Sequence, residues 1–285
     1  MAWAVTRSVV DRRPFVEYLR REHNVDDGQE RFVEALLDLY EDKRVAPNGR
    51  DEPLHRVCPN CQTCWQEHRE REPEDFTAGI SVPWVGRRYA DMRVAVVAVN
   101  LNNMGGYDAQ WVLQADVRRE LQAGSKMPKR SPFGWAVGCY LDAITASLAG
   151  REPAATPRAP QTVAELWEDC ALLEFVKCSP TTTSHADVSA PSAEMWSNCG
   201  PFLLPGELDA LSPRVLILLD KDVAWNTKVL LEVPVVQDVP YFDRLVSEGR
   251  NERMELLCLN HPSSPTWRKS YKRLVKSLRE HPLGA

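Results

Sequence analysis

The sequence has no apolar stretch long enough to cross a membrane, because no run approaches the roughly 18 residues that a spanning helix requires. A secretory signal is not expected either, since charge interrupts the first residues, MAWAVTRSVVDRRPF, too early. We therefore expect a cytoplasmic protein, monomeric and without a membrane partner.

An excess of positive charge is also missing. The 285 residues include 35 lysines and arginines against 40 aspartates and glutamates, for a formal net charge of −5. Because net charge alone would repel phosphate, any contact with nucleic acid must come from a local basic surface. Hydrophobic residues make up 44% and charged residues 26%, which excludes a wholly disordered chain and a fibrous repeat.

Cysteine, in contrast, is plentiful, with eight in the chain. Disulfides are not expected in a reducing compartment. Cys58, Cys61 and Cys64 are spaced C-x-x-C-x-x-C among polar residues, which is typical of metal ligands rather than of a packed core. A C-x-x-C pair cannot saturate a metal ion, so further ligands must come from elsewhere in the chain.

Hydrophobic periodicity divides the chain into two parts. Residues 1–57 carry charges at helical spacing and predict an N-terminal helical extension of two helices, with apolar faces near residues 15–19 and 32–40. Residues 58–285 form the main domain, in which continuous apolar runs alternate with helical patterns. Strands are predicted at 93–100, 171–178, 214–220, 233–238 and within 252–262; helices are predicted at 108–123, 131–150, 192–212 and 265–281. This alternation predicts an α/β fold: a three-layer α/β/α sandwich with a mostly parallel central sheet.

Polar residues follow three of the predicted strands directly. They occupy residues 100–103, 177–180 and 260–263. Ligands of open α/β sheets bind outside the carboxyl ends of the strands, and all three segments belong to that edge of a parallel sheet. The sequence therefore predicts a functional site there.

The order of the motifs carries a resemblance to a known family. The motifs are CPNCQTC, RVAVVAVNLNN, SPFGWA, EFVKCSP, MWSNCGP, RVLILLD and NHPSSP, spread over about residues 58–280. In this order they resemble the uracil-DNA glycosylase superfamily, and more narrowly its iron–sulfur branches. The resemblance implies a monofunctional DNA N-glycosylase, which flips out a non-canonical base, excises it and leaves an abasic site.

The resemblance also implies a [4Fe–4S] cluster in a cysteine-rich loop region. Cys178 and Cys199 would join two of Cys58, Cys61 and Cys64 as ligands, and the sequence does not choose among the three. Four thiolates also suit zinc, which remains the alternative metal. The expected role is structural, since such a site would tie loops near the DNA to the core.

Two residues match the catalytic motifs of the family. The first motif, of the type G-[QEM]-[DNA]-P, reads A-V-N-L here, so that Ala98 and Leu101 depart from it. Asn100 stands at the position whose side chain orients the attacking water, and Asp108 is a less favoured alternative as the base. His261 matches the histidine that hydrogen-bonds O2 of the leaving base, where negative charge develops.

Further residues match contacts with the flipped base and with DNA. Phe133 matches the aromatic ring that stacks on the base. Ser263 and Ser264 are expected to grip phosphate. Trp267 and Arg268 stand where the family's loop enters the minor groove, although Trp267 equally fits a role in packing the terminal helix onto the core. The basic run that follows, up to Lys276, predicts either phosphate contacts or a solvated helix face.

Glu174 suggests the substrate. Uracil-specific relatives carry asparagine here, which donates to O4 and accepts from N3–H. A glutamate accepts from N4 of cytosine and, if burial keeps it protonated, donates to N3. Asn102, Gly105 and Gly106 leave room beside C5 of the base. We therefore expect a 5-modified cytosine, such as the hydroxymethylated or glucosylated cytosine of some phage genomes, and a role in antiviral defence.

Four alternatives remain open from the sequence. The first is that Glu174 is a buried ion-pair partner rather than the residue that reads the base. The second is that the enzyme acts in excision repair of uracil or another deaminated base. A catalytically silent DNA-binding member is the third, because Ala98 and Leu101 depart from the family motif. An iron–sulfur redox protein is the fourth, and it gives no use to the NHPSSP loop.

Overall fold

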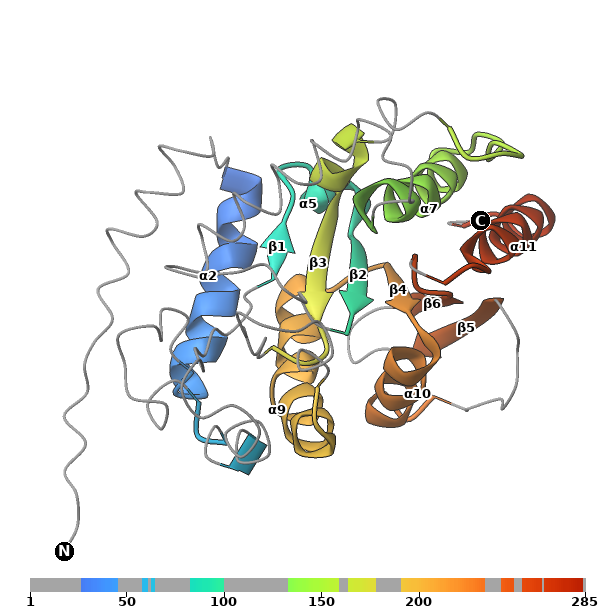
Figure 1. Ribbon diagram of the computed structural model, residues 1–285. Helices are drawn as coiled ribbons and strands as arrows, with labels where there is room; N and C mark the ends of the chain where they lie inside the picture. The colour runs from blue at the N-terminus through green and yellow to red at the C-terminus, as the bar shows by residue number, and fades with distance from the viewer. Residues whose placement is uncertain are drawn as a thin grey trace, which may run out of the picture.

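In a computed structural model of the chain, the described residues are 27–45, 58–60, 63–64, 83–99, 133–158, 164–177, 191–233, 242–248, 253–262 and 264–283. These stretches form a mixed α/β fold around one six-stranded sheet (Figure 1). None of the helices found in them is long and apolar enough to cross a membrane.

The sheet is parallel in its centre and antiparallel at both edges. Its strand order is β1-β3-β2-β4-β6-β5. The four inner strands run parallel, whereas β1 pairs antiparallel with β3 and β5 pairs antiparallel with β6. The strands are β1 Trp84–Val85, β2 Val94–Ala98, β3 Cys170–Glu174, β4 Val215–Leu219, β5 Phe242–Glu248 and β6 Arg253–Leu259.

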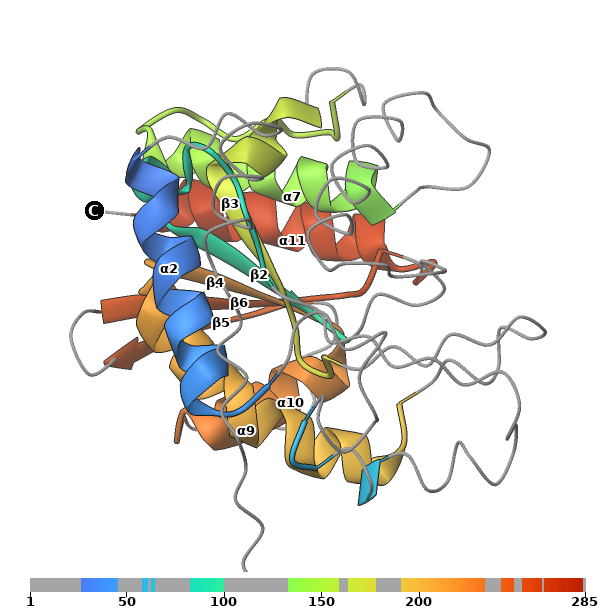
Figure 2. The ribbon, with the colours of Figure 1, turned by 90° about the vertical axis from the view of Figure 1, so that its left-hand side faces the viewer.

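Alternate residues of the inner strands belong to two separate hydrophobic cores, as the period of two in a strand requires. In β2, Ala95 and Val97 pack into a core with α2, α9 and α10, while Val94 and Val96 pack into a core with α7 and α11. Figure 2 shows α7 and α11 on one side of the sheet and α9 and α10 on the other, and Figure 1 shows α2 beside the edge strand β1. The helices are α2 Asp27–Asp42, α5 Tyr89–Met92, α7 Phe133–Leu148, α9 Ala193–Leu211, α10 Lys221–Leu230 and α11 Trp267–Glu280, with a 3₁₀ helix, η1, at Ala164–Asp169.

The strands predicted at 93–100, 171–178, 214–220 and 252–262 are confirmed as β2, β3, β4 and β6. The helices predicted at 131–150, 192–212 and 265–281 are likewise confirmed, as α7, α9 and α11, and the one near 32–40 is α2. The helix near 15–19, the helix at 108–123 and most of the strand at 233–238 lie outside the described residues.

Two edge strands and α10 were not predicted, for a physical reason. β1 is only two residues long, too short to give a periodic pattern, and β5 pairs with another strand on one side only, so it does not need a continuous apolar run. In β5, Arg244 forms a cross-strand ion pair with Glu255 (Nε–Oε2 3.0 Å), and Asp243 pairs with Lys228 of α10 at 2.5 Å. These charged residues interrupt the apolar pattern of β5 and α10, so hydrophobic periodicity does not reveal either element.

Helix α2 shares the core of the domain that follows it. Its Phe32 ring lies edge-on to Tyr89 of α5, with 5.0 Å between ring centroids. Leu39 lies so close to α9 that a Cβ at Gly206 would overlap its side chain. Gln29 donates a hydrogen bond to the carbonyl of Val85 in β1. The second helix of the N-terminal extension therefore forms part of one hydrophobic core with α9 and the sheet.

Candidate active site at the carboxyl ends of the strands

The carboxyl ends of the inner strands are held side by side by backbone hydrogen bonds. The amide of Phe175 donates to the carbonyl of Ala98 (2.8 Å), which continues the pairing of β2 and β3 beyond both strands. The amide of Asp220 donates to the carbonyl of Leu259 (2.9 Å) and joins the ends of β4 and β6. Asn100 and Asn102 lie outside the described residues, two and four positions after Ala98.

Glu174 ends β3, and its carboxyl group is buried. It is 3% exposed, and among the described residues neither carboxyl oxygen has a partner. Burial raises the pKa of Glu174 to about 8; the charge of Glu207 adds to this rise in pKa and that of Lys177 opposes it. At neutral pH the group is therefore mostly a protonated acid, with one O–H donor and a carbonyl acceptor.

A buried charged network lies beside Glu174. Lys177 Nζ is 2.6 Å from Glu207 Oε2, and both side chains are fully buried. Tyr40, from α2, donates a hydrogen bond to the other oxygen of Glu207. Burial, and then the charge of Glu207, raises the pKa of the Tyr40 hydroxyl far above its ordinary value. Because Lys177 pairs with Glu207, the ion-pair alternative for Glu174 has no support among the described residues.

Phe133 and His261 meet at the same edge of the sheet, although they are far apart in the sequence. Phe133 begins α7 and His261 follows β6, with 5.7 Å between the ring centroids and 38° between the ring planes. Burial lowers the pKa of His261, while the charge of Asp220 opposes this effect. The imidazole is therefore neutral at neutral pH, and a neutral imidazole has one N–H donor.

Hydrogen bonds order the loop that carries His261. The amide of Asn260 donates to Ser270 Oγ (3.1 Å), and its side chain donates to Thr266 Oγ1 (2.6 Å). The amide of Ser264 donates to the His261 carbonyl (2.9 Å), and its hydroxyl lies 2.7 Å from that of Thr266. The Ser264 hydroxyl is therefore engaged within the loop, and Ser263 lies outside the described residues.

The two aromatic and basic residues at the start of α11 have different environments. Trp267 is 5% exposed and lies edge-on to Trp135 and Tyr140 of α7, with ring centroids 5.5 and 6.3 Å away. Its side chain packs α11 onto the core, as the second of its two predicted roles describes. Arg268 is exposed, with its guanidinium 5.5 Å from the centre of the Trp267 ring. Arg268 can therefore reach phosphate, whereas Trp267 would first have to leave the core.

Three of the five candidate metal ligands lie in one buried region. Cys58, Cys64 and Cys199 are each less than 9% exposed. Burial raises the pKa of Cys64, and charge on Cys199 and Cys58 raises it further. Cys61 and Cys178 lie outside the described residues.

Two hydrogen-bond donors point at these sulfur atoms. The backbone amide of Lys177 donates to Cys199 Sγ (3.0 Å), and the Asn198 side chain donates to Cys64 Sγ (3.4 Å). Within the described stretches, no three histidine, cysteine or acidic side chains form a group that could hold a metal ion. The described residues therefore show buried cysteines with two N–H···S contacts, and they do not show a metal loop.

Sequence reasoning missed Asp220, at the end of β4. Its backbone has φ 92° and ψ 150°, which is costly for a residue with a side chain, and its carboxylate accepts from the Asp222 amide (3.0 Å) at the start of α10. Its charge acts on His261 across the site. The signal was present in RVLILLD, an apolar run that ends in an acid at the carboxyl edge of the sheet.

Comparison with models of known protein families gives no match for this chain, and comparison with curated proteins gives none either. The function is therefore inferred from the geometry of the site and from the sequence motifs.

Proposed function

We propose that the protein is a monofunctional DNA N-glycosylase that flips a non-canonical base out of DNA and excises it. One observation carries the proposal: Glu174 is a buried acid, with no hydrogen-bond partner among the described residues, at the sheet edge where His261 and Phe133 also lie. An unpaired buried carboxyl group costs free energy, so a bound partner with complementary donors and acceptors would compensate it.

The edge of a pyrimidine supplies that partner. Cytosine N4 donates to the carboxyl C=O of Glu174, and its N3 accepts from the protonated O–H. The two oxygens of a neutral carboxyl can exchange these roles, so the protonated acid also pairs with uracil. The raised pKa of Glu174 thus removes the charge-based argument against uracil and leaves selectivity to the space beside C5.

The sequence of residues 102–106, which has no aromatic side chain to face C5, predicts room beside C5 of the base. These residues lie outside the described residues. The favoured substrate is therefore still a 5-hydroxymethyl or glucosylated cytosine in phage DNA, with a role in antiviral defence. Excision of uracil or another deaminated base is the alternative.

The reaction breaks the bond between C1′ and the base nitrogen. The bonding electrons leave with the base, and water adds to C1′ and loses a proton. Phe133 stacks on the base, while neutral His261 donates to O2 as negative charge develops there. Asn100 orients the water. Lys177 is held in its buried pair with Glu207, so it is not placed to form a Schiff base with the sugar.

The cysteine region fits an iron–sulfur cluster. N–H donors directed at Cys64 and Cys199 are what thiolate ligands of a metal require around them. Two of Cys58, Cys61 and Cys64, together with Cys178 and Cys199, would hold a [4Fe–4S] cluster, or zinc as the alternative. When bound, the cluster would link the ends of β3 and α9 to the N-terminal cysteines, with no part in the chemical step.

Metal analysis tests this assignment. Protein purified without oxygen should contain about four iron and four sulfide per chain. Cys199→Ser should lose most of both and unfold at a lower urea concentration, whereas Cys170→Ser, which alters a buried cysteine of β3, should keep its iron. A colourless wild-type protein that holds one zinc would overturn the cluster in favour of zinc.

The domain has two hydrophobic cores on opposite sides of the sheet, and we therefore assign it to the three-layer α/β/α class. The protein is expected to act as a monomer on DNA, and in the cytoplasm.

The decisive experiment is base release from defined DNA. Oligonucleotides carrying uracil, hypoxanthine, cytosine, 5-hydroxymethylcytosine or its glucosylated form are incubated with the protein, and abasic sites are then cleaved with alkali. Cleavage at one modified base, with none at cytosine, supports the proposal and identifies the substrate. Binding without cleavage of any oligonucleotide would favour a catalytically silent DNA-binding protein.

His261→Ala should slow single-turnover excision by about 10²-fold while DNA affinity changes less than threefold. The reason is that its hydrogen bond strengthens only as the base becomes anionic. Asn260→Ala is the matched loop control, because it disturbs the loop hydrogen bonds without removing the imidazole. A His261→Ala protein that binds DNA poorly but excises at the normal rate once saturated would show that the loop only clamps DNA.

A further inference from the structure

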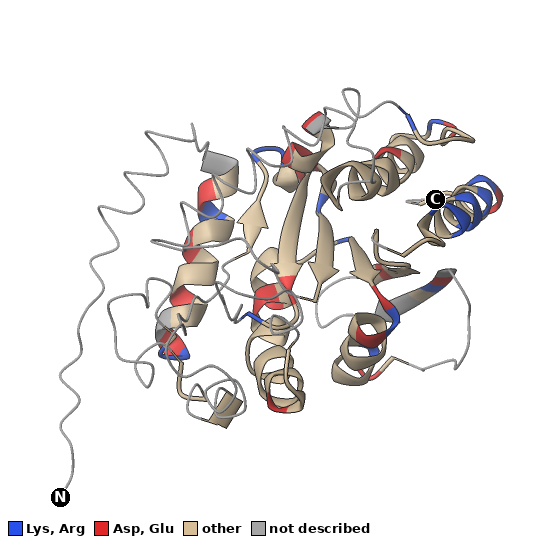
Figure 3. Cartoon of the chain, in the orientation of Figure 1, with Lys and Arg blue, Asp and Glu red and all other residues tan. Residues whose placement is uncertain are grey.

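Helix α11 has an apolar side that packs onto the core and an exposed side that carries its charged residues. Its buried side consists mainly of Trp267, Tyr271, Leu274, Val275 and Leu278. Its exposed side carries one acid, Glu280, and six cations: Arg268, Lys269, Lys272, Arg273, Lys276 and Arg279. Figure 3 shows this concentration of basic residues on α11. In a chain of net charge −5, the helix is a local basic surface of the kind that nucleic-acid binding would require.

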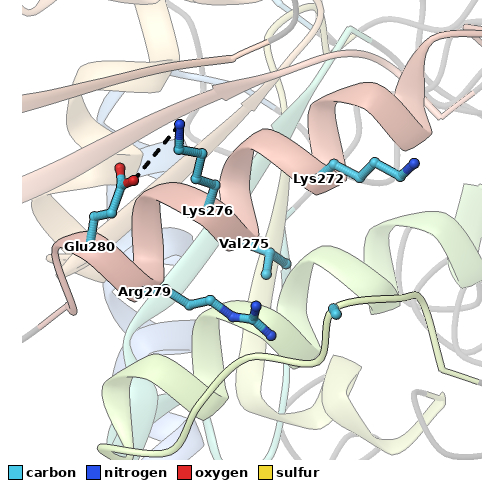
Figure 4. A pocket seen from close by; sticks show the side chains of 6 residues that line it. Lys272, Val275, Lys276, Arg279 and Glu280 are labelled. Atoms are coloured by element: carbon cyan, nitrogen blue, oxygen red, sulfur yellow. Dashed lines mark ion pairs between the residues drawn. The ribbon is translucent and has the colours of Figure 1, made fainter.

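A hollow of about 270 Å³ lies along the second half of the helix. It is lined by Ala155 and by Lys272, Val275, Lys276, Arg279 and Glu280 of α11. Figure 4 shows Val275 and Arg279 extending from α11 toward a neighbouring segment, while the paired side chains of Lys276 and Glu280 extend from the other side of the helix. The hollow combines a small apolar surface with three cations, which suits a phosphate group and its sugar.

The cations of the hollow are only weakly compensated. Lys276 lies 3.8 Å from Glu280, and Arg279 Nε lies 3.0 Å from Glu152, in pairs whose side chains are all largely exposed. Exposed pairs of this kind contribute little and are easily exchanged for another anion. Lys272 has no ion pair with any described residue, so its charge is available to a ligand.

We infer that the exposed face of α11, with the hollow beside residues 272–280, binds the sugar–phosphate backbone of DNA. The inference rests on the proposed function and extends it to a second contact, beyond the base-reading edge. The helix begins directly after the loop of His261, so its basic row starts at the site. DNA is favoured over a lipid surface because this row begins directly after the loop that carries His261, which contacts Phe133 at the proposed site.

The spacing of the cations matches a path along the sugar–phosphate backbone of DNA. Arg268, Lys272, Lys276 and Arg279 follow one another at four, four and three residues and so share one side of the helix. At 1.5 Å per residue the row is about 17 Å long. At 3.4 Å per base pair, it would follow about five base pairs of DNA beside the flipped nucleotide.

Charge reversal tests the inference. Lys272→Glu/Lys276→Glu removes the central cations, and Arg214→Glu/Arg253→Glu makes the same charge change at exposed sites beside the amino ends of β4 and β6. Affinity for an unmodified 30-base-pair duplex is measured by fluorescence anisotropy over a range of salt concentrations, together with single-turnover excision at saturating DNA.

The α11 variant should lose about tenfold or more in affinity, and its log–log salt slope should become shallower by about two. The control should keep the wild-type slope, and the excision rate at saturation should not change in either protein. An unchanged slope in the α11 variant, or an equal loss in the control, would overturn the inference. Wild-type binding to anionic phospholipid vesicles but not to DNA would overturn it as well.

The same data separate this inference from the proposed function. A wild-type protein that binds DNA through α11 but releases no base supports the basic track and refutes the glycosylase. A wild-type protein that excises a base, with an α11 variant that binds and excises as well as the wild type, refutes only the track.

Discussion

Glu207→Ala is expected to lower the free energy of unfolding by about 3–5 kcal/mol, because it leaves the Lys177 ammonium buried without its counter-charge. Lys177 and Glu207 are fully buried and 2.6 Å apart, and Tyr40 donates to the same carboxylate. The substitution also removes the acceptor of the Tyr40 hydroxyl. Urea unfolding, followed by tryptophan fluorescence and by circular dichroism, measures the effect as a lower transition midpoint.

A compensated variant separates the loss of charge pairing from the loss of volume. Tyr40→Phe/Lys177→Met/Glu207→Met removes every member of the network and replaces it with apolar groups of similar size. It should recover most of the stability that Glu207→Ala loses, since the damage comes from an unpaired buried charge. If the free energy of unfolding of Glu207→Ala lies within about 1 kcal/mol of the wild-type value, the buried network does not hold the carboxyl end of β3 in place.

Glu174→Gln is expected to stabilise the protein increasingly as pH rises from 5 to 8. The pKa of Glu174 is raised from 4.5 to about 8 in the folded state. Its contribution to stability is therefore fully present below pH 4.5 and is lost as pH rises toward 8, because unfolding lets the acid ionise. At pH 7 this loss is about 3 kcal/mol. Glutamine does not ionise, so the Glu174→Gln variant should not lose this stability as pH rises.

The same substitution should change the pH dependence of excision. Glutamine offers one donor and one acceptor, as the protonated acid does, so Glu174→Gln should retain most of the activity at pH 7, with a modest fall on a cytosine-type base and the same relative activity on uracil. Wild-type activity should fall above about pH 8, as Glu174 ionises, and the variant should show no such fall. Glu174→Ala should lose about tenfold or more at every pH, because the base edge is left unpaired.

Glu34→Gln, on the exposed side of α2, is the control for these measurements: it removes one acid but keeps Glu174, so its stability should fall with pH as that of the wild type does. If wild type and Glu174→Gln share one pH profile for both stability and excision, Glu174 is not a neutral acid in the folded site and does not read the base.

The inner strands could be predicted because they are buried on both faces. In β2 and β4 every residue is buried, so a continuous apolar run in the sequence was sufficient. The edge strands β1 and β5 depend on pairing with β3 and β6, and no periodic signal of their own marks them. Helix α10 was missed because Lys228 on its buried side is compensated by a partner from β5.

The position of the site at the carboxyl ends of the strands could be predicted from the sequence. The charge states of its residues could not. Phe133 and His261, proposed from separate motifs, do lie together. The charge state of Glu174 depended on whether Lys177 pairs with it or with Glu207, and Glu207 comes from a different element, α9. Only three-dimensional proximity decides between two carboxylates for one lysine. The burial of Trp267 is similar, because it depends on the facing surface of α7.

The close packing of α2 determines how short the protein can be made. A version that begins at the cysteine-rich segment would lose the Tyr40 hydroxyl and would expose the apolar side of α9 to water, including Leu203 and Leu204. Such a surface favours aggregation rather than catalysis. The smallest piece of the chain that folds by itself must therefore begin at or before residue 27, and libraries of truncated or circularly permuted variants should keep α2 joined to the sheet.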